Sequence, residues 1–213
     1  MLVLLPPSEG KQAPRRGRPV DLGALAFADA LTPARAQVLD AVDPGLRAAP
    51  AAAAATVYAG VLFQALGLAE LPAAARRRVF IFSGLWGVLR PGDRIPAYKL
   101  PIATRVSGLG TLAAHWRPLL RDALPDRGLV VDLRSGPYAA TWTPRRATRL
   151  TVRAFTPEGN VVSHMVKATR GRVGRILLTA ATAPRTAEQA LELVRAAGLD
   201  ARLDAGSLDV VER

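Results

Sequence analysis

The sequence predicts an α/β fold: a single domain, residues 1–213, in which helices flank one mixed sheet. Three observations support this class. Apolar runs of four or five residues have the length of buried strands, and longer amphipathic stretches have the pattern of helices. Half of the residues are hydrophobic, which is enough for a sizeable core. No internal repeat or change of composition divides the chain, and its length lies within the single-domain range.

The first half of the chain contains two expected strands and two expected helices. Short apolar runs predict buried strands over Leu2–Leu5 and Val79–Phe82. Helical patterns predict helices over Ala34–Val42, which Pro44 and Gly45 follow, and over Val57–Leu68. Glycines punctuate residues 83–93, which we interpret as a connection without regular structure.

The second half of the chain contains the remaining elements. An amphipathic stretch that ends at Pro125 predicts a helix over Thr111–Leu124. Two apolar runs around the turn-forming residues 156–160 predict a hairpin of strands 150–155 and 161–165. The other expected elements are a strand over Leu129–Leu133, helices over Thr169–Ala181 and Thr186–Ala197, and a terminal hairpin of strands Ala201–Leu203 and Leu208–Val211.

The composition excludes several classes of site. The chain has no cysteine, which excludes a disulfide framework, a cysteine-based zinc site and a thiol nucleophile. Its two histidines, His115 and His164, are far apart in sequence, whereas a metal site needs three or four convergent ligands. Gly10 and Lys11 lack the rest of a phosphate-binding P-loop pattern. We therefore expect no metal and no cofactor.

The chain shows no membrane or export signal. Pro6 follows the apolar residues Met1–Leu5 at once, whereas a signal peptide needs a basic start and a longer apolar stretch. The longest uncharged stretch, Ala48–Ala69, is rich in weakly apolar alanine and contains Pro50, so it does not resemble a membrane span. We expect a cytoplasmic protein.

The net charge of +12 favours partners that carry phosphate. Arginines occur in short groups along the chain, among them Arg15–Arg18 in a polar loop over residues 12–19. This distribution predicts affinity for polyanions without sequence-specific reading, and double-stranded DNA or another phosphate-bearing ligand is the expected partner. The alternative is that genome composition enriched arginine and that the surface has no dedicated basic patch.

Lysine is almost absent from this basic chain. Of the 29 basic residues, only Lys11, Lys99 and Lys167 are lysines, and the other 26 are arginines. Arginine replaces lysine readily on a solvated face, but not where a compact or deprotonatable ammonium is needed. Each lysine lies beside an apolar run and near small or turn-forming residues. We therefore expect the three to share one polar site, with chance retention as the alternative.

Polar and glycine residues follow three apolar runs, at 5–11, 82–87 and 133–138. Such strand ends present backbone N–H groups that bind anions, while lysine supplies point charges, arginine bidentate forks and tyrosine stacking surfaces. A carboxylate at Asp132 within a buried strand requires an arginine partner. The candidate ligand- or phosphate-binding residues are Ser8, Lys11, Ser83, Arg90, Tyr98, Lys99, Arg134, Ser135, Tyr138, Lys167, Arg170 and Arg175.

The most specific motif is the run Ser-Gly-Leu-Trp-Gly-Val-Leu-Arg-Pro over Ser83–Pro91, followed by Asp93 and by Tyr98-Lys99-Leu100. It resembles the YaaA peroxide-stress protein family, which often has tyrosine in place of the tryptophan and arginine in place of Lys99. Further matches follow in order along nearly the whole chain, at residues 57–60, 131–138 and 163–175.

The resemblance implies a compact α/β fold with a positively charged cleft. It also implies double-stranded DNA binding and a role in protecting DNA and limiting free iron under peroxide stress. DNA binding in the family has been linked to a helix-hairpin-helix element, for which the turn over Leu66–Pro72 is the nearest candidate here. The alternative function is an enzyme that acts on a nucleotide, a nucleobase or a small phosphorylated metabolite, because the motifs concentrate serine, lysine, tyrosine and arginine at loop ends.

Overall fold

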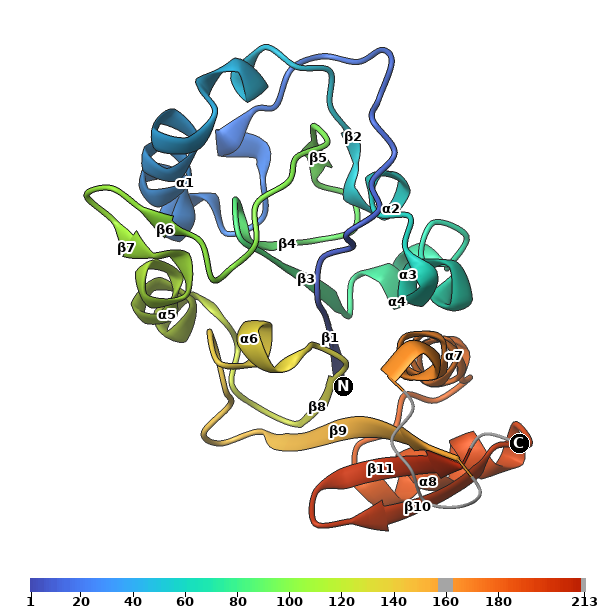
Figure 1. The fold of residues 1–213 in the computed structure, drawn as a ribbon. Coiled ribbons are helices and arrows are strands. Elements are labelled where there is room, and N and C mark those ends of the chain that lie inside the picture. The colour runs from blue at the N-terminus through green and yellow to red at the C-terminus, as the bar shows by residue number, and fades with distance from the viewer. Residues whose placement is uncertain (157–162, 212–213) are drawn as a thin grey trace.

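The α/β class is confirmed by the structure, a computed structural model that describes residues 1–156 and 163–211. Within these residues a seven-stranded sheet has the order β10-β11-β9-β8-β1-β3-β4 (Figure 1). Its strands are β1 (Leu2–Leu5), β3 (Val79–Ser83), β4 (Gly87–Leu89), β8 (Leu129–Asp132), β9 (Thr148–Phe155), β10 (Asp200–Asp204) and β11 (Ser207–Val211).

The middle of the sheet is parallel. Strand β1 lies between β3 and β8 and runs parallel to both, with Val3 opposite Val79 on one side and opposite Val131 on the other. Strands β8, β9 and β11 continue the parallel arrangement, and β4 and β10 close the two edges in antiparallel pairs. Strands covered on both faces need apolar side chains throughout, which explains the short continuous runs in the sequence.

Helices cover both faces of this sheet. Helix α7 (Ser163–Thr179) packs beside α3 (Val61–Leu66) and α8 (Ala187–Ala196) on one side. Helices α1 (Ala28–Val42) and α5 (Leu112–Ala123) pack on the other, as Figure 1 shows. One hydrophobic core joins the sheet to both layers. None of the helices in the described part of the chain combines the length and the apolar composition needed to cross a bilayer.

Helices α1 and α3 differ from the boundaries expected. Helix α1 begins at Ala28, six residues before the expected start, and it contains Pro33. The expected helix over Val57–Leu68 is shorter, because Val57 ends the short helix α2 (Ala54–Val57) and Tyr58 instead pairs with Lys11 in an isolated bridge. Helix α3 then begins after Gly60 and ends at Gly67, whose left-handed backbone (φ 60°) suits glycine.

In the second half of the chain the expected elements are present except for one strand, and the helix expected over Thr169–Ala181 begins earlier and spans Ser163–Thr179. Helices α5 and α8 begin where the sequence predicted, and Thr111 and Thr186 are their N-cap residues. The terminal hairpin β10–β11 is also confirmed. The expected strand over 161–165 is wrong at residues 163–165, which belong to α7, and residues 161–162 lie outside the described chain. Lys167 therefore lies within a helix and not at the end of a strand.

Several short elements were not expected. Strand β4 forms a tight hairpin with β3 inside residues 83–93, where the sequence predicts only a glycine-punctuated connection. Gly87, the first residue of β4, has a positive φ of 70°. The glycine content of this region conceals the strand in the sequence. The remaining short elements are β2 (Ala52–Ala53), β5 (Arg94–Ile95), β6 (Arg105–Val106), β7 (Gly110–Thr111), α4 (Ala73–Arg76), α6 (Gly136–Ala139), and the 3-10 helices η1 (Leu22–Ala24) and η2 (Pro44–Arg47).

We predict that Gly171→Ala destabilises the fold. Gly171 lies where α7 crosses α3, and a Cβ atom there would come within 2.4 Å of the Leu62 carbonyl oxygen and 2.7 Å of the Ala65 Cβ. Backbone cannot yield as a flexible side chain can, so we expect a loss of about 1–3 kcal/mol in unfolding free energy, the usual cost of overpacking. Urea denaturation measures this change.

Gly92→Ala is the control for this prediction. A Cβ atom at Gly92 would meet no other heavy atom within 4 Å, and its backbone φ is not positive. An equal loss of stability in the two variants would contradict a specific close approach between α3 and α7.

Candidate functional site

The sheet topology brings three loops to one edge. Strands β1, β3 and β8 are parallel neighbours, so their carboxyl ends lie together, followed by residues 6–11, 84–86 and 133–138. The chain passes from β1 to β3 on one side and later returns to β8 on the other. Such a reversal of strand order leaves a crevice between neighbouring loops, where open α/β sheets bind their ligands.

The loop after β1 is fixed by pairing with residues 57–59. Lys11 forms an isolated antiparallel bridge with Tyr58, and the backbone N–H of Ala59 donates to the Gly10 carbonyl at 3.2 Å. The buried Ser8 hydroxyl also donates to the Gly10 carbonyl, at 2.6 Å. A Cβ at Gly60 would lie 2.3 Å from the Ser8 Oγ, so only glycine leaves room for this loop.

A buried chain of hydroxyl groups lies under this loop. The Tyr98 Oη is 2.6 Å from the Ser83 Oγ and 2.7 Å from the Tyr58 Oη. The Ser83 Oγ also accepts hydrogen bonds from the backbone N–H groups of Leu85 and Trp86, at 3.2 and 2.9 Å. These bonds satisfy polar groups that would otherwise be costly to bury. Ser83, at the end of β3, is thereby linked to two other segments of the chain.

All three tyrosines of the chain contribute to this region. Burial and the neighbouring phenol of Tyr98 raise the pKa of Tyr58, and burial raises the pKa of Tyr98. Tyr138, in the loop region after β8, also has a raised pKa, because burial and the charge of Glu9 outweigh a hydrogen bond with the Ile102 backbone. The three phenols therefore remain protonated at neutral pH.

Lys11 lies against the two buried tyrosines. Its Nζ is 4.6 Å from the centroid of the Tyr98 ring and 5.5 Å from that of Tyr58, within cation–π range. The ammonium also donates a hydrogen bond to the Ser8 carbonyl at 2.5 Å. Burial lowers the pKa of Lys11 to about 8, an effect that the negative charge of Glu9 partly opposes.

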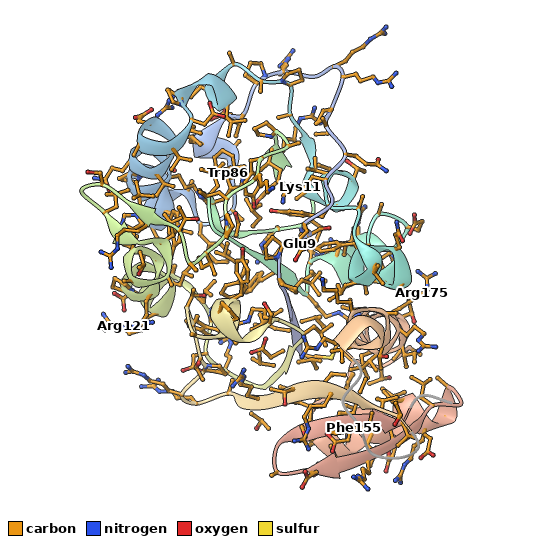
Figure 2. The ribbon with its side chains drawn as sticks, viewed as in Figure 1. Glu9, Lys11, Trp86, Arg121, Phe155 and Arg175 are labelled. Atoms are coloured by element: carbon orange, nitrogen blue, oxygen red, sulfur yellow. The ribbon has the colours of Figure 1, made fainter. Side chains whose placement is uncertain are left out.

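Lys167 connects α7 to the same loop. Its Nζ is 3.8 Å from a carboxylate oxygen of Glu9, and both side chains are largely exposed. Ser135, after β8, is exposed and its side chain makes no capping bond to α6. We use the name strand-edge cluster for the residues that these contacts and the three loops place at this edge: Ser8, Glu9, Lys11, Tyr58, Ser83, Tyr98, Ser135, Tyr138 and Lys167. Figure 2 shows Glu9 and Lys11 near the centre of the molecule.

Arg134 is committed to an internal ion pair. Its guanidinium donates two hydrogen bonds of 2.8 Å to the carboxylate of Asp132, and neither side chain is exposed to solvent. It also donates to the backbone carbonyls of Tyr138 and Trp142. Arg149 adds a further 2.8 Å contact to Asp132. The arginine partner expected for Asp132 is present, and it fixes the loop that carries Ser135.

The remaining candidates lie outside the strand-edge cluster or have structural partners. Lys99 lines a hollow of about 400 Å³ together with Asp43, Leu46 and Tyr98, so this hollow borders the strand-edge cluster at Tyr98. Arg90 lies at the opposite edge of the sheet, where it donates to the Arg77 carbonyl just before β3. Arg170 and Arg175 donate to the backbone carbonyls of β9 and α3, respectively.

Sequence reasoning omitted Tyr58 from the site, although its ring and hydroxyl contact Lys11 and Tyr98. The Val-Tyr-Ala-Gly segment over residues 57–60 was a recognised motif, and its tyrosine was the available signal. Trp86 is fully buried, as expected for a core tryptophan. Among residues 1–156 and 163–211, no group of three or more histidine, aspartate and glutamate side chains is placed to hold a metal ion.

Comparison with known proteins decides the family. The sequence profile described as Peroxide stress protein YaaA matches residues 24–201. A UPF0246 protein of Streptomyces coelicolor is 42% identical over 243 aligned residues, which cover 96% of this chain and 93% of that protein. A UPF0246 protein of Corynebacterium efficiens is 34% identical, with 97% and 96% covered. The chain belongs to the YaaA peroxide stress protein family.

Family membership agrees with the resemblance that the motifs indicated. The profile includes Ser83, Tyr98 and Lys167, whereas Ser8 and Lys11 precede its first matched residue. The relatives nevertheless align with almost the whole chain. The YaaA family assignment therefore covers β3 and β8 and the loops after them.

We predict that Asp132→Asn destabilises the fold by about 3–5 kcal/mol, because it leaves Arg134 buried without a counter-charge. Burial alone would raise the pKa of Asp132, but the hydrogen bonds and charges of Arg134 and Arg149 hold it below its ordinary value. The stabilisation is therefore present at neutral pH and is lost as the pH falls below about 4. Urea midpoints of wild type and variant at pH 7 and pH 3 measure the change.

The control is Asp122→Asn, which breaks an exposed pair with Arg121. Exposed pairs contribute at most about 1 kcal/mol, so this variant should unfold nearly as wild type does. A similar small loss in Asp132→Asn would show that the buried pair is unimportant for stability.

We predict that the stability difference between wild type and Lys11→Gln increases from pH 7 to pH 9.5. The pKa of Lys11 is lowered to about 8 in the folded chain from 10.5. Between these values the unfolded chain binds more protons, so the free energy of unfolding rises with pH. The variant lacks this contribution. Urea midpoints at the two pH values measure it, and a difference independent of pH would contradict a buried, readily deprotonated amine.

Proposed function

We propose that this member of the YaaA family binds the phosphate backbone of double-stranded DNA and so protects DNA during peroxide stress. The observation that carries this proposal is a set of exposed arginines without acidic partners. Within the described chain, these side chains donate no hydrogen bond and form no ion pair: Arg15, Arg16, Arg18, Arg105, Arg127 and Arg185. Unpaired guanidinium groups are free to replace the counterions that surround DNA phosphates.

The densest group of these arginines continues from the strand-edge cluster. Arg15, Arg16 and Arg18 follow Lys11 in a loop that the Gln12 N–H anchors to the Val57 carbonyl. Arg94 lies against the same loop, since a Cβ at Gly17 would meet its guanidinium at 3.2 Å. A phosphate backbone that lies along this loop would therefore approach the cluster. We call residues 12–18 the basic loop.

We include the limiting of free iron in the proposed role on the basis of the family resemblance. A cytoplasmic location belongs to the same proposal, because chromosomal DNA is the expected partner. The support from this chain's own residues concerns phosphate binding.

A second candidate is a nucleotide or small phosphorylated metabolite bound at the strand-edge cluster, where an enzyme could act on it. The specific observation in its favour is the position of Lys11 and Lys167 beside a topological switch point, where α/β folds bind such ligands. A thermal-shift screen separates the two candidates. A nucleotide that raises the melting temperature at concentrations where duplex DNA has no effect would favour the second.

We predict that replacing Arg15, Arg16 and Arg18 together by glutamine weakens binding to duplex DNA and reduces its salt dependence. Each phosphate contact contributes about 0.9 to the slope of log affinity against log salt concentration, so the loss of three contacts lowers the slope by up to about 2.7. Fluorescence anisotropy with a labelled duplex at several salt concentrations measures both quantities.

Arg121→Gln is the matched control, because Arg121 is exposed but paired with Asp122 (Figure 2 shows its position on α5). We expect its affinity and salt slope to stay close to those of wild type. Binding through the phosphate backbone would be contradicted if the affinity of the wild type did not change with salt concentration. A strong preference for one DNA sequence over scrambled DNA would also contradict it.

A further inference from the structure

We propose that the Lys11 amine is a nucleophile that forms an imine with the aldehyde of a ring-opened abasic sugar in DNA. This inference rests on the DNA-binding function proposed above and adds a covalent step to it. An abasic deoxyribose in DNA exists partly as an open-chain aldehyde at C1′, which an unprotonated primary amine attacks. Imine formation with carbonyl compounds is a typical reaction of an activated lysine.

The position of Lys11 distinguishes it from an ordinary surface lysine. Its side chain is partly buried over the rings of Tyr58 and Tyr98, and the Ser8 carbonyl orients its Nζ. Among the described residues, no carboxylate lies within ion-pair distance of the Lys11 Nζ. The nearby carboxylate of Glu9 pairs with Lys167. Burial of this nitrogen favours the neutral amine, and it outweighs the ring faces, the Ser8 carbonyl and the charge of Glu9, which favour the ammonium.

The neutral form is the reactive one. Burial lowers the pKa of Lys11 to about 8, so a fraction on the order of a tenth is unprotonated near pH 7. A lysine with the reference pKa of about 10.4 would be unprotonated to less than about one part in a thousand at that pH. Arginine cannot serve in this role because its guanidinium does not deprotonate in proteins. This requirement gives a reason for a lysine at position 11 in a chain that uses arginine elsewhere.

The reaction balances without any oxidant, reductant or cofactor. The Lys11 Nζ lone pair attacks the C1′ carbon, and the carbonyl oxygen accepts a proton to give a carbinolamine. The new C–N bond then becomes double as the hydroxyl group leaves with a proton as water. The sum is one amine and one aldehyde giving one imine and one water, and hydrolysis by water reverses it.

The surroundings of Lys11 suit a sugar that is part of a DNA strand. The basic loop begins directly after Lys11 and supplies Arg15, Arg16 and Arg18 for phosphates. Lys167 lies nearby, and its charge becomes available to a phosphate that displaces the exposed carboxylate of Glu9. The phosphates on either side of an abasic sugar would therefore meet cations, while the sugar itself approaches the amine.

The test uses the full chain and a duplex with one abasic site, incubated with sodium borohydride, which reduces an imine to a stable secondary amine. We expect a covalent protein–DNA complex on a denaturing gel, and peptide mass spectrometry should place the adduct on Lys11. A duplex with a tetrahydrofuran residue in place of the abasic sugar has no aldehyde and should give no complex.

Two variants complete the test. Each is used at a DNA concentration that saturates binding, so that a lower yield of trapped complex does not reflect weaker binding. Lys11→Arg keeps a positive charge but cannot form an imine, and we expect its yield of trapped complex to fall at least tenfold. Lys99→Arg removes an amine outside the strand-edge cluster and should keep the wild-type yield.

The outcomes separate this inference from the proposed function. Binding of the tetrahydrofuran duplex without any trapped complex on the abasic duplex would overturn the inference alone. An adduct located on Lys99, Lys167 or the N-terminal amine of the wild type would also overturn it, as would an undiminished yield from a folded Lys11→Arg variant. Failure to bind any duplex would overturn the DNA-binding proposal as well.

Discussion

The parallel pairing of β1 with both β3 and β8 is the constraint on which the rest of this structure depends. It buries three apolar strands side by side and forces the three loops that follow them to one edge of the sheet. The polar residues of the strand-edge cluster meet there although they are more than a hundred positions apart in sequence. Internal bonds then fix each loop: the Lys11–Tyr58 bridge after β1, the Ser83 hydroxyl after β3, and the Asp132–Arg134 pair after β8.

Charge is used in two different ways on this framework. In the interior, Asp132 binds Arg134 and Arg149, so these arginines stabilise a loop and are not available to a ligand. On the surface, the arginines of the basic loop have no such partner within the described residues and can contact phosphate. Lys11 stands between these two cases, since it is partly buried and lacks a carboxylate at ion-pair distance.

Much of the fold could be predicted from the sequence because its central strands are built on short apolar runs, as at Leu2–Leu5 and Leu129–Val131. The misassigned residues 163–165 show the limit of this reasoning. Residues 161–165 contain three apolar side chains, and so short a segment fits a strand or a helix equally well. In the structure, residues 163–165 belong to α7, which packs against α3 at Gly171. At the site, the rarity of lysine pointed to Lys11 and Lys167, and the buried Asp132 predicted an arginine partner, but the sequence could not show that this partner is Arg134.

The most direct test of this account is an NMR titration of the protein with an intact DNA duplex, following lysine and arginine side-chain signals. The account predicts that the largest shifts occur at Lys11, Lys167 and the arginines of the basic loop, and that Lys99 and Arg121 change little. Shifts concentrated at Lys99 or Arg121, with Lys11 and the basic loop unaffected, would contradict the claim that the carboxyl edge of β1, β3 and β8 is the functional site.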